Sequence, residues 1–142
     1  MAIWFQSYTL EGVQKRGRST MVEHLGITIT ELGDDYLAGT LPVDHRTIQP
    51  MGILHGGASV ALAETLGSIA ANLVVDPQKQ YCVGLDINAN HIRAARSGLV
   101  TGKAKPLHLG SSTQVWSIEI TDEEQRLVCI SRLTMAVLNK SS

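Results

Sequence analysis

The sequence has few cysteines, few aromatic residues and almost no excess of charge. Two of its 142 residues are cysteine, Cys82 and Cys129, too few and too far apart for a disulfide framework or a zinc knuckle. Two reduced thiols are typical of an intracellular protein, so we expect a cytoplasmic location. The formal net charge of -1 argues against the strongly basic surface by which nucleic-acid partners are bound.

Long uninterrupted hydrophobic runs are also lacking. The longest apolar stretch, residues 58–75, contains Glu64, Ser68 and Asn72, so we do not expect it to cross a membrane. The N-terminal residues lack a basic start followed by an apolar core, which argues against a secretory signal. With 44% hydrophobic and 18% charged residues and no linker-like segment, the chain is expected to form one domain over residues 1–142.

Short helices and a hairpin are expected in the first third of the chain. Residues 9–17 fit a short amphipathic helix, and residues 19–26 fit a further turn or two. Residues 27–43 alternate apolar and polar positions around a turn at residues 33–35, a pattern typical of a β-hairpin. A loop between residues 42 and 50 then leads to the apolar stretch.

Alternation returns after residue 77 and predicts four strands. In the first of them a period of two places five side chains on one face: Val83, Leu85, Ile87, Ala89 and His91. Residues 99–110, 112–122 and 126–138 predict three further strands. The expected order of hairpin, helix and antiparallel strands is an α+β arrangement, with one long helix against a curled sheet.

The helix expected over residues 58–75 carries a single acidic residue, Glu64. Apolar and small residues occupy nearly every face, so this helix is expected to be buried nearly all round. A carboxylate in such a setting loses several kcal/mol of hydration unless a structural ion pair or a chemical task compensates. Ser68 lies one turn further on the same face, where it could hold a water or a ligand. Gly67 is expected to leave room for a neighbouring chain or a substrate.

The residues before this helix form a second candidate feature. Gly56 and Gly57 expose backbone N–H groups at the positive end of the helix dipole, where an oxygen that becomes negative during a reaction is stabilised. Glycines in this position are also ordinary helix caps, and His91 equally fits a histidine of the core. His55, Glu64 and His91 show no compact metal-ligand spacing, so no metal is expected.

Three segments resemble the hotdog-fold acyl-CoA thioesterases, in the branch that hydrolyses aromatic acyl-CoA. They are QPMGILHGGASVALAETLGSIAA, VGLDINANHIRAARSG and KPLHLGSSTQVWSIEI. The similarity is greatest to the subgroup that includes 1,4-dihydroxy-2-naphthoyl-CoA hydrolases of menaquinone biosynthesis and the proofreading thioesterase of enterobactin biosynthesis. The resemblance implies a hotdog fold, in which a curved antiparallel sheet wraps a long central helix.

The resemblance also implies roles for individual residues. Glu64 is implied to act as a nucleophile or as a general base toward water, and the Gly56 N–H to bind the thioester oxygen. Four further residues match positions that place the thioester, hold the water or intermediate, or belong to the same pocket: Gln49, His55, Ser68 and His91.

Substrate contacts are expected from apolar and basic side chains. Val60, Ile69 and Val83 are expected to line the acyl pocket. Basic candidates for the phosphates of coenzyme A are Arg93 and Arg96, with Lys103 and Lys105 as weaker ones. Coenzyme A is part of the substrate, so no separate cofactor is implied, and an acyl carrier protein thioester is the alternative carrier. The family implies a homo-oligomer with shared sites, commonly a tetramer.

Three functions fit these residues. Thioester hydrolysis is favoured by the order of Gln49, His55, Gly56 and Glu64 and by the presence of Ser68. A hydroxyacyl dehydratase of the same fold and a non-catalytic acyl-CoA-binding dimer module are the alternatives.

Overall fold

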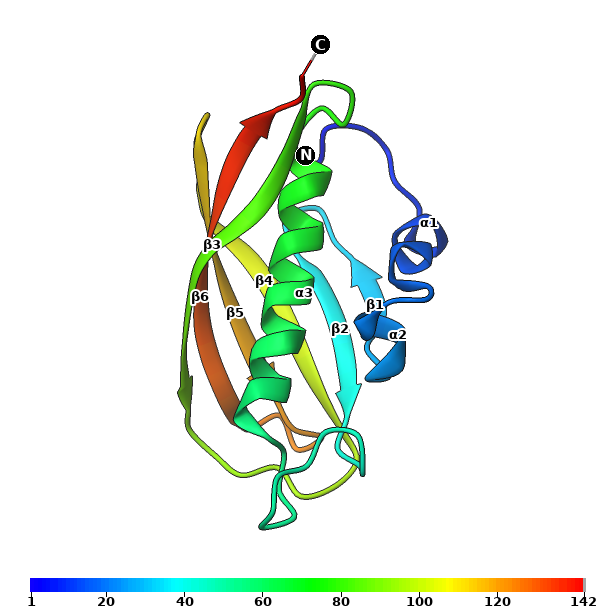
Figure 1. The fold of residues 1–142 in the computed structure, drawn as a ribbon, viewed down its shortest axis with the longest axis vertical. Coiled ribbons are helices and arrows are strands. Elements are labelled where there is room, and N and C mark those ends of the chain that lie inside the picture. The colour runs from blue at the N-terminus through cyan, green and yellow to red at the C-terminus, as the bar shows by residue number, and fades with distance from the viewer. Residues whose placement is uncertain (142) are drawn as a thin grey trace.

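The computed structural model describes residues 1–141, which form one long helix packed against a six-stranded antiparallel sheet (Figure 1). The helix is α3 (Gly56–Val74), and the strands are β1 (Thr28–Leu32), β2 (Leu37–Pro42), β3 (Gln80–His91), β4 (Leu99–Leu109), β5 (Thr113–Thr121) and β6 (Leu127–Asn139). The shorter α1 (Leu10–Gln14), the 3₁₀ turn η1 (Lys15–Gly17) and α2 (Met21–His24) precede them. The strand order β1-β2-β4-β5-β6-β3 and the central helix confirm the predicted α+β hotdog fold.

Side-chain caps fix where the helices begin. Thr9 and Thr20 each accept a hydrogen bond from a backbone N–H in the first turn of α1 and α2. The long helix begins at Gly56, two residues earlier than expected, because Nδ1 of His55 accepts a hydrogen bond from the Gly57 N–H at 2.8 Å. The predicted hairpin is confirmed as β1 and β2.

Residues without side chains let α3 lie close to the sheet. A Cβ at Gly67 would be 2.5 Å from Cδ2 of Leu133 on β6. From the sheet side, a Cβ at Gly39 or Gly102 would come within 3.0 or 2.7 Å of the Leu66 side chain. Gly67 therefore faces the core, and the expectation that it opens the helix to a neighbouring chain or a substrate is wrong.

The opposite side of α3 is only partly covered by its own chain. Ala61, Glu64, Thr65 and Ser68 are half-buried, so the prediction that the helix is buried nearly all round is wrong for the single chain. By length and composition α3 could cross a membrane, but it is 50% buried and occupies the position of a core helix.

The face pattern of β3 also differs from the prediction. A β-bulge occurs at Leu85, because Gly84 and Asp86 pair with successive residues of β6. One inserted residue moves every following side chain to the other face. Val83 and Leu85 are 41% and 61% exposed, on the side away from α3 or at the bulge, rather than on the face shared by Ile87, Ala89 and His91.

Asn72 joins α3 to β3, which is an edge strand of the sheet. Its Oδ1 accepts a hydrogen bond from the Cys82 N–H at 2.8 Å, and its Nδ2 donates to the Cys82 carbonyl at 3.2 Å. The same Nδ2 donates to the Ser68 carbonyl one turn earlier at 2.9 Å. A single amide thereby fixes the position of β3 along the helix.

We expect Asn72→Ala to lower the free energy of unfolding by about 1–3 kcal/mol, because both polar groups of Cys82 lose their side-chain partner. Urea denaturation monitored by circular dichroism measures this. Asn88→Ala is the control, since Asn88 is exposed on the same strand, and it should change stability by less than about 0.5 kcal/mol. Equal losses in the two variants would contradict the role given to Asn72.

Candidate active site

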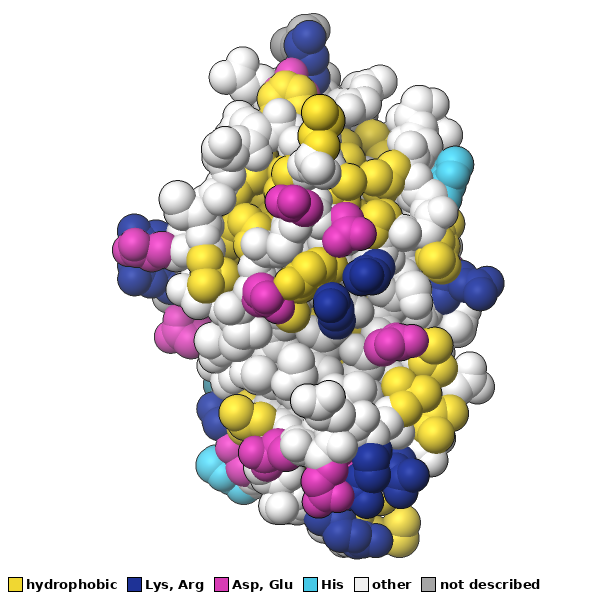
Figure 2. Space-filling view, turned by 180° about the vertical axis from the view of Figure 1, so that it is seen from behind, with side chains coloured by type: hydrophobic (Ala, Val, Ile, Leu, Met, Phe, Trp, Pro, Cys, Tyr) yellow, Lys and Arg dark blue, Asp and Glu magenta, His cyan; other side chains and the backbone are white. Residues whose placement is uncertain are grey.

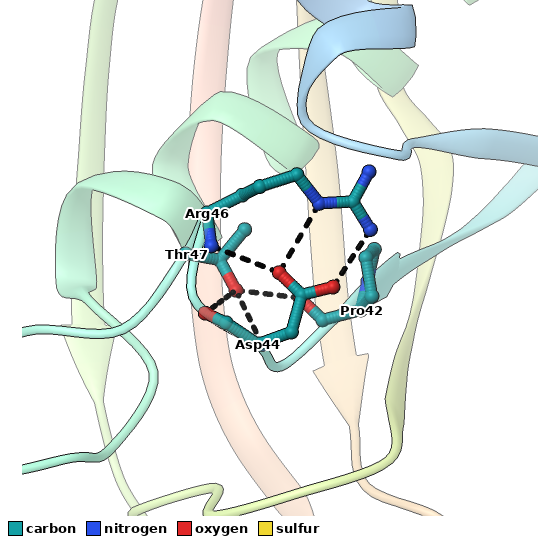
Figure 3. Close-up of polar contacts among 4 residues, drawn as sticks. All are labelled: Pro42, Asp44, Arg46 and Thr47. Atoms are coloured by element: carbon teal, nitrogen blue, oxygen red, sulfur yellow. Dashed lines mark hydrogen bonds and ion pairs between the residues drawn. The ribbon is translucent and has the colours of Figure 1, made fainter.

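A tightly bonded loop, residues 43–55, connects β2 to α3 (Figure 3). Thr47 is 2% exposed; its hydroxyl donates to the Pro42 carbonyl at 2.6 Å and accepts from the Asp44 N–H at 3.1 Å. Arg46 binds the Asp44 carboxylate through two side-chain hydrogen bonds, at 2.7 and 3.2 Å. The His55 N–H then donates to the Thr47 carbonyl at 2.8 Å, so the loop sets where α3 begins.

The first turn of α3 leaves one backbone donor free. The Gly57 N–H is bound by Nδ1 of His55, and the Ala58 and Ser59 N–H groups donate to the His55 carbonyl at 2.9 and 3.2 Å. Among residues 1–141 the Gly56 N–H has no acceptor. Because Nδ1 of His55 accepts a hydrogen bond, the N–H of the ring is on Nε2, and His55 is an exposed residue, so this N–H is a second donor at the helix start.

A cavity of about 330 Å³ lies beside this free donor. Four of the predicted site residues line it: Gln49, Gly56, His91 and Arg93. A Cβ at Gly56 would be 2.9 Å from Nε2 of His91, so the imidazole lies directly against the helix start. Oε1 of Gln49 accepts from the Met51 N–H, which leaves the side-chain NH₂ available to a ligand.

Ser59 lines the same cavity and was not predicted from the sequence. It is 2% exposed, and its hydroxyl makes no hydrogen bond in the part of the chain that the structure describes. The available signal was its position three residues after Gly56, which places both on one side of a helix.

Glu64 lies two turns further along α3, outside that cavity. Its carboxylate rests against β3, where a Cβ at Gly84 would be 2.5 Å from Oε2. Within residues 1–141 this half-buried carboxylate makes no hydrogen bond and no ion pair, and no three acidic, histidine or cysteine side chains group as a metal ion would require. Ser68, one turn on, contacts Sδ of Met135 at 3.9 Å. The structural ion pair that could have explained Glu64 is absent from these residues.

The three apolar residues expected in an acyl pocket lie apart in the single chain. Val60 is half-buried on α3. Ile69 lines a groove of about 330 Å³ beneath α1 and α2, together with Gln14 and Ile27. Val83 is exposed on the face of β3 turned away from α3. A single chain therefore does not gather these three side chains into one cavity, and their place in an acyl pocket stays a prediction.

Arg93 and Arg96 line a neighbouring hollow of about 430 Å³. Arg126 in the same hollow is already occupied, since it pairs with Asp122 at 2.9 Å and with Glu124 at 3.1 Å. Backbone and side-chain hydrogen bonds from Arg126 hold the pKa of Asp122 below its usual range. Arg93 and Arg96 have no ion pair among residues 1–141, so both guanidinium groups are available to a phosphate.

The outer face of the sheet, turned away from α3, carries scattered side chains of both charge signs (Figure 2). Lys103 on β4 lies opposite Glu119 on β5, and its ammonium is 4.0 Å from the ring centroid of Tyr36. Lys105 is exposed on the same face. Neither lysine lines the cavity beside Gly56.

Comparison with known proteins decides the family, because residues 51–129 match the thioesterase superfamily. The chain belongs to this superfamily. It is 56% identical to 1,4-dihydroxy-2-naphthoyl-CoA hydrolase from Escherichia coli, over 96% of this chain and 99% of that relative. It is 54% identical to the proofreading thioesterase EntH from Cronobacter sakazakii, over 96% of this chain and 98% of that relative.

A solved thioesterase structure shows the same architecture. A Gln-to-Ala variant of thioesterase PA1618 from Pseudomonas aeruginosa superimposes with a TM-score of 0.96 at 46% identity, covering 98% of this chain and 100% of that one. The hotdog fold and the assignment as a thioester hydrolase are thereby confirmed. The matched residues include the last part of the loop, from residue 51, together with α3 and β3.

We expect the loop to contribute a pH-dependent term to stability. Hydrogen bonds from Arg46 lower the pKa of Asp44 from 3.8 to about 2. A carboxylate with a lowered folded-state pKa stabilises the fold above its unfolded value, and this contribution is lost as the pH falls through the folded value. The difference in thermal midpoint between wild type and Asp44→Asn should be constant above about pH 5 and shrink toward pH 2. Thermal denaturation at several pH values measures it, and a difference that grows on acidification would contradict the assignment.

Proposed function

We propose that this thioesterase hydrolyses acyl-CoA, with Glu64 as the reacting carboxylate. The observation that carries the proposal is the state of Glu64: it is the single acidic residue of α3, is half-buried, and has no partner among residues 1–141. Removing a carboxylate from water without a partner is costly, so its presence there indicates a chemical task.

Attack on a thioester carbonyl puts negative charge on the oxygen, and the chain provides a donor for it. The Gly56 N–H is free and lies at the positive end of α3; fixed donors of this kind contribute about 3–4 kcal/mol to catalysis. Glu64 either attacks the carbonyl to form a mixed anhydride, which water then hydrolyses, or takes a proton from an attacking water. In both routes the C–S bond breaks and the thiol of coenzyme A leaves, and in both Glu64 must be ionised.

Gly56 and Glu64 of one chain are too far apart to act on the same carbonyl. Eight residues of α-helix span about 12 Å along the axis, more than a glutamate side chain can reach. We therefore propose that each site takes the Gly56 side from one protomer and Glu64 from another. Gln49 and His91 line the cavity beside Gly56 and belong to that side of the site.

Strand β3 is the proposed place of association. It pairs with β6 on one side only, and Tyr81, Val83 and Leu85 are at least 40% exposed on it. An edge strand with free backbone groups and apolar side chains readily accepts a second strand. Two copies joined at β3 would form one continuous sheet with the two α3 helices on the same face, and such dimers are proposed to assemble into tetramers.

The proposed substrates are aromatic acyl-CoA thioesters of the benzoyl and hydroxynaphthoyl type. This follows from the relatives, one named as a 1,4-dihydroxy-2-naphthoyl-CoA hydrolase. The predicted pocket residues Val60, Ile69 and Val83 are apolar, and an apolar pocket discriminates by only about 1–3 kcal/mol per methylene. Arg93 and Arg96 are proposed to bind the phosphates, with a carrier-protein thioester as the alternative substrate. The cytoplasm, where acyl-CoA is made, is the proposed location.

Glu64→Gln should fold normally and lose hydrolysis by several orders of magnitude, because the amide keeps the shape and removes the charge. Thiol release from benzoyl-CoA, hydroxynaphthoyl-CoA and a medium-chain acyl-CoA measures this loss. The same panel measures substrate preference, and the kcat/KM of the wild type should differ in graded steps from one acyl-CoA to the next. More than about a tenth of wild-type turnover, which is under about 1.4 kcal/mol of barrier, would contradict the assignment. Dehydration without thiol release, or binding without turnover, would identify the two alternative functions.

Shared sites can be tested by mixing two inactive variants, Glu64→Gln and Gln49→Ala. In a mixed dimer one site takes Gln49 from the first variant and Glu64 from the second, so that site is intact. Random mixing should restore about one quarter of wild-type activity, since half of the dimers are mixed and each has one working site. Light scattering establishes the assembly, and mixed assemblies without any recovery would contradict the shared site.

A further inference from the structure

We propose that Gly84 positions the Glu64 carboxylate for reaction, while the β-bulge that follows it at Leu85 places His91 against Gly56. The inference rests on the proposed function of Glu64 and adds to it a residue that touches no substrate. Gly84 lies on β3 directly beneath α3, two residues after the strand is fixed by Asn72 at Cys82.

The missing side chain at Gly84 makes room for the Glu64 carboxylate, and the backbone conformation there does not require glycine. Its φ is not among the positive values of this chain, which occur at Gly26, Gly52 and Gly98 among the glycines. A Cβ built there would lie 2.5 Å from Oε2 of Glu64 and 3.5 Å from its Cδ. The next atom, Cδ1 of Leu133, is 3.9 Å away, at ordinary contact distance. Since glycine weakens a strand interior, the space it leaves must serve a contact, and that contact is Glu64.

The bulge at Leu85 determines which residues further along β3 face the helix. Cys82 and Gly84 face α3, and a regular strand would then turn residues 86, 88 and 90 toward the helix. The extra residue at Leu85 moves Ile87, Ala89 and His91 to that face instead. The His91 ring thus lies against Gly56 while Gly84 lies against Glu64, so one strand contacts both the start of the helix and the carboxylate near its middle. Bulges beside active sites commonly re-aim side chains in this way.

Everything near Gly84 is firmly held except the end of Glu64. Asn72 fixes the strand at Cys82, and Leu133 is fully buried in the core. A methyl group at position 84 would therefore displace the flexible carboxylate and leave the sheet in place. A displacement of about 1 Å at a reacting group can cost about 100-fold in rate.

The experiment is a double-mutant comparison of Gly84→Ala in the wild-type, Glu64→Asp and Glu64→Gln backgrounds. We expect Gly84→Ala to lower kcat at least about tenfold in the wild type and to change KM less than about twofold. In the other two backgrounds it should change the residual activity by less than about twofold. The shorter aspartate is already withdrawn from position 84, and the glutamine amide, although displaced, no longer carries the reacting charge. Asn88→Ala, on the exposed side of the same strand, is the activity control.

Three outcomes would overturn the positioning role. One is a loss under about threefold in the wild-type background while Glu64→Gln is inactive, which leaves the proposed function intact. Another is an equal loss in all backgrounds, which marks a structural glycine. The third outcome applies if Gly84→Ala folds poorly. The thermal midpoint of Gly84→Ala is then compared with that of the double variant Gly84→Ala/Glu64→Ala. If removing the Glu64 side chain does not restore the thermal midpoint, the destabilisation does not come from Glu64 and the positioning role is refuted. Activity in Glu64→Gln itself would instead refute the proposed function.

Discussion

The close packing of α3 on the sheet is the constraint on which the other features of this thioesterase depend. Leu133 occupies the space left by Gly67, and Leu66 occupies the space left by glycines of β2 and β4. Each fully buried leucine contributes about 1.5–3 kcal/mol, so this seam is a major source of stability. Because the helix lies so near the strands, β3 touches it at Gly84 and at His91 as well as at Cys82. A larger residue in the seam would lift the helix and separate these contacts.

Several polar groups that hold the fold are hydrogen-bonded, whereas those at the candidate site are open; the buried hydroxyls of Tyr8 and Ser131 are exceptions away from that site. Nε1 of the fully buried Trp116 donates to Oε1 of Gln114 at 2.9 Å, and Nε2 of Gln114 is 3.5 Å from the Ala71 carbonyl. Asn72 is bonded on both sides of its amide. By contrast, the Glu64 carboxylate and the Gly56 N–H have no partner among residues 1–141. With the Ser59 hydroxyl, these are three unpartnered polar groups on one helix, and they are where a ligand would complete the bonding.

Local patterns predicted the elements because each is strongly periodic over its own length. The hairpin, the long helix and strands β4 to β6 follow from alternation or from apolar composition alone. The bulge at Leu85 could not be predicted in this way, since it depends on pairing with β6, about fifty residues further along the chain. Helix capping by His55 was missed for a different reason: imidazole is not among the common capping side chains.

The site was predictable in part for the same physical reasons. Gln49, Gly56 and His91 were placed together by the family resemblance, and they do line one cavity. Ser59 was missed because its one signal, a position three residues after Gly56 on an apolar helix, is too common to single out a site residue. Ile69 and Val83 were assigned to one pocket, yet their surroundings depend on where the N-terminal helices pack and on which edge of the sheet β3 occupies. Long-range packing of this kind leaves no mark on a local pattern.

The position of β3 at the edge has a consequence for the order in which the protein is completed. This strand is synthesised before β4, β5 and β6, yet its one pairing partner within the chain is β6, from Gln80 opposite Asn139 to His91 opposite Cys129. On the ribosome β3 therefore has no described strand of its own chain to pair with until β6 has been synthesised. The residues of β6, about fifty positions further along, are the ones that complete the sheet beneath Glu64.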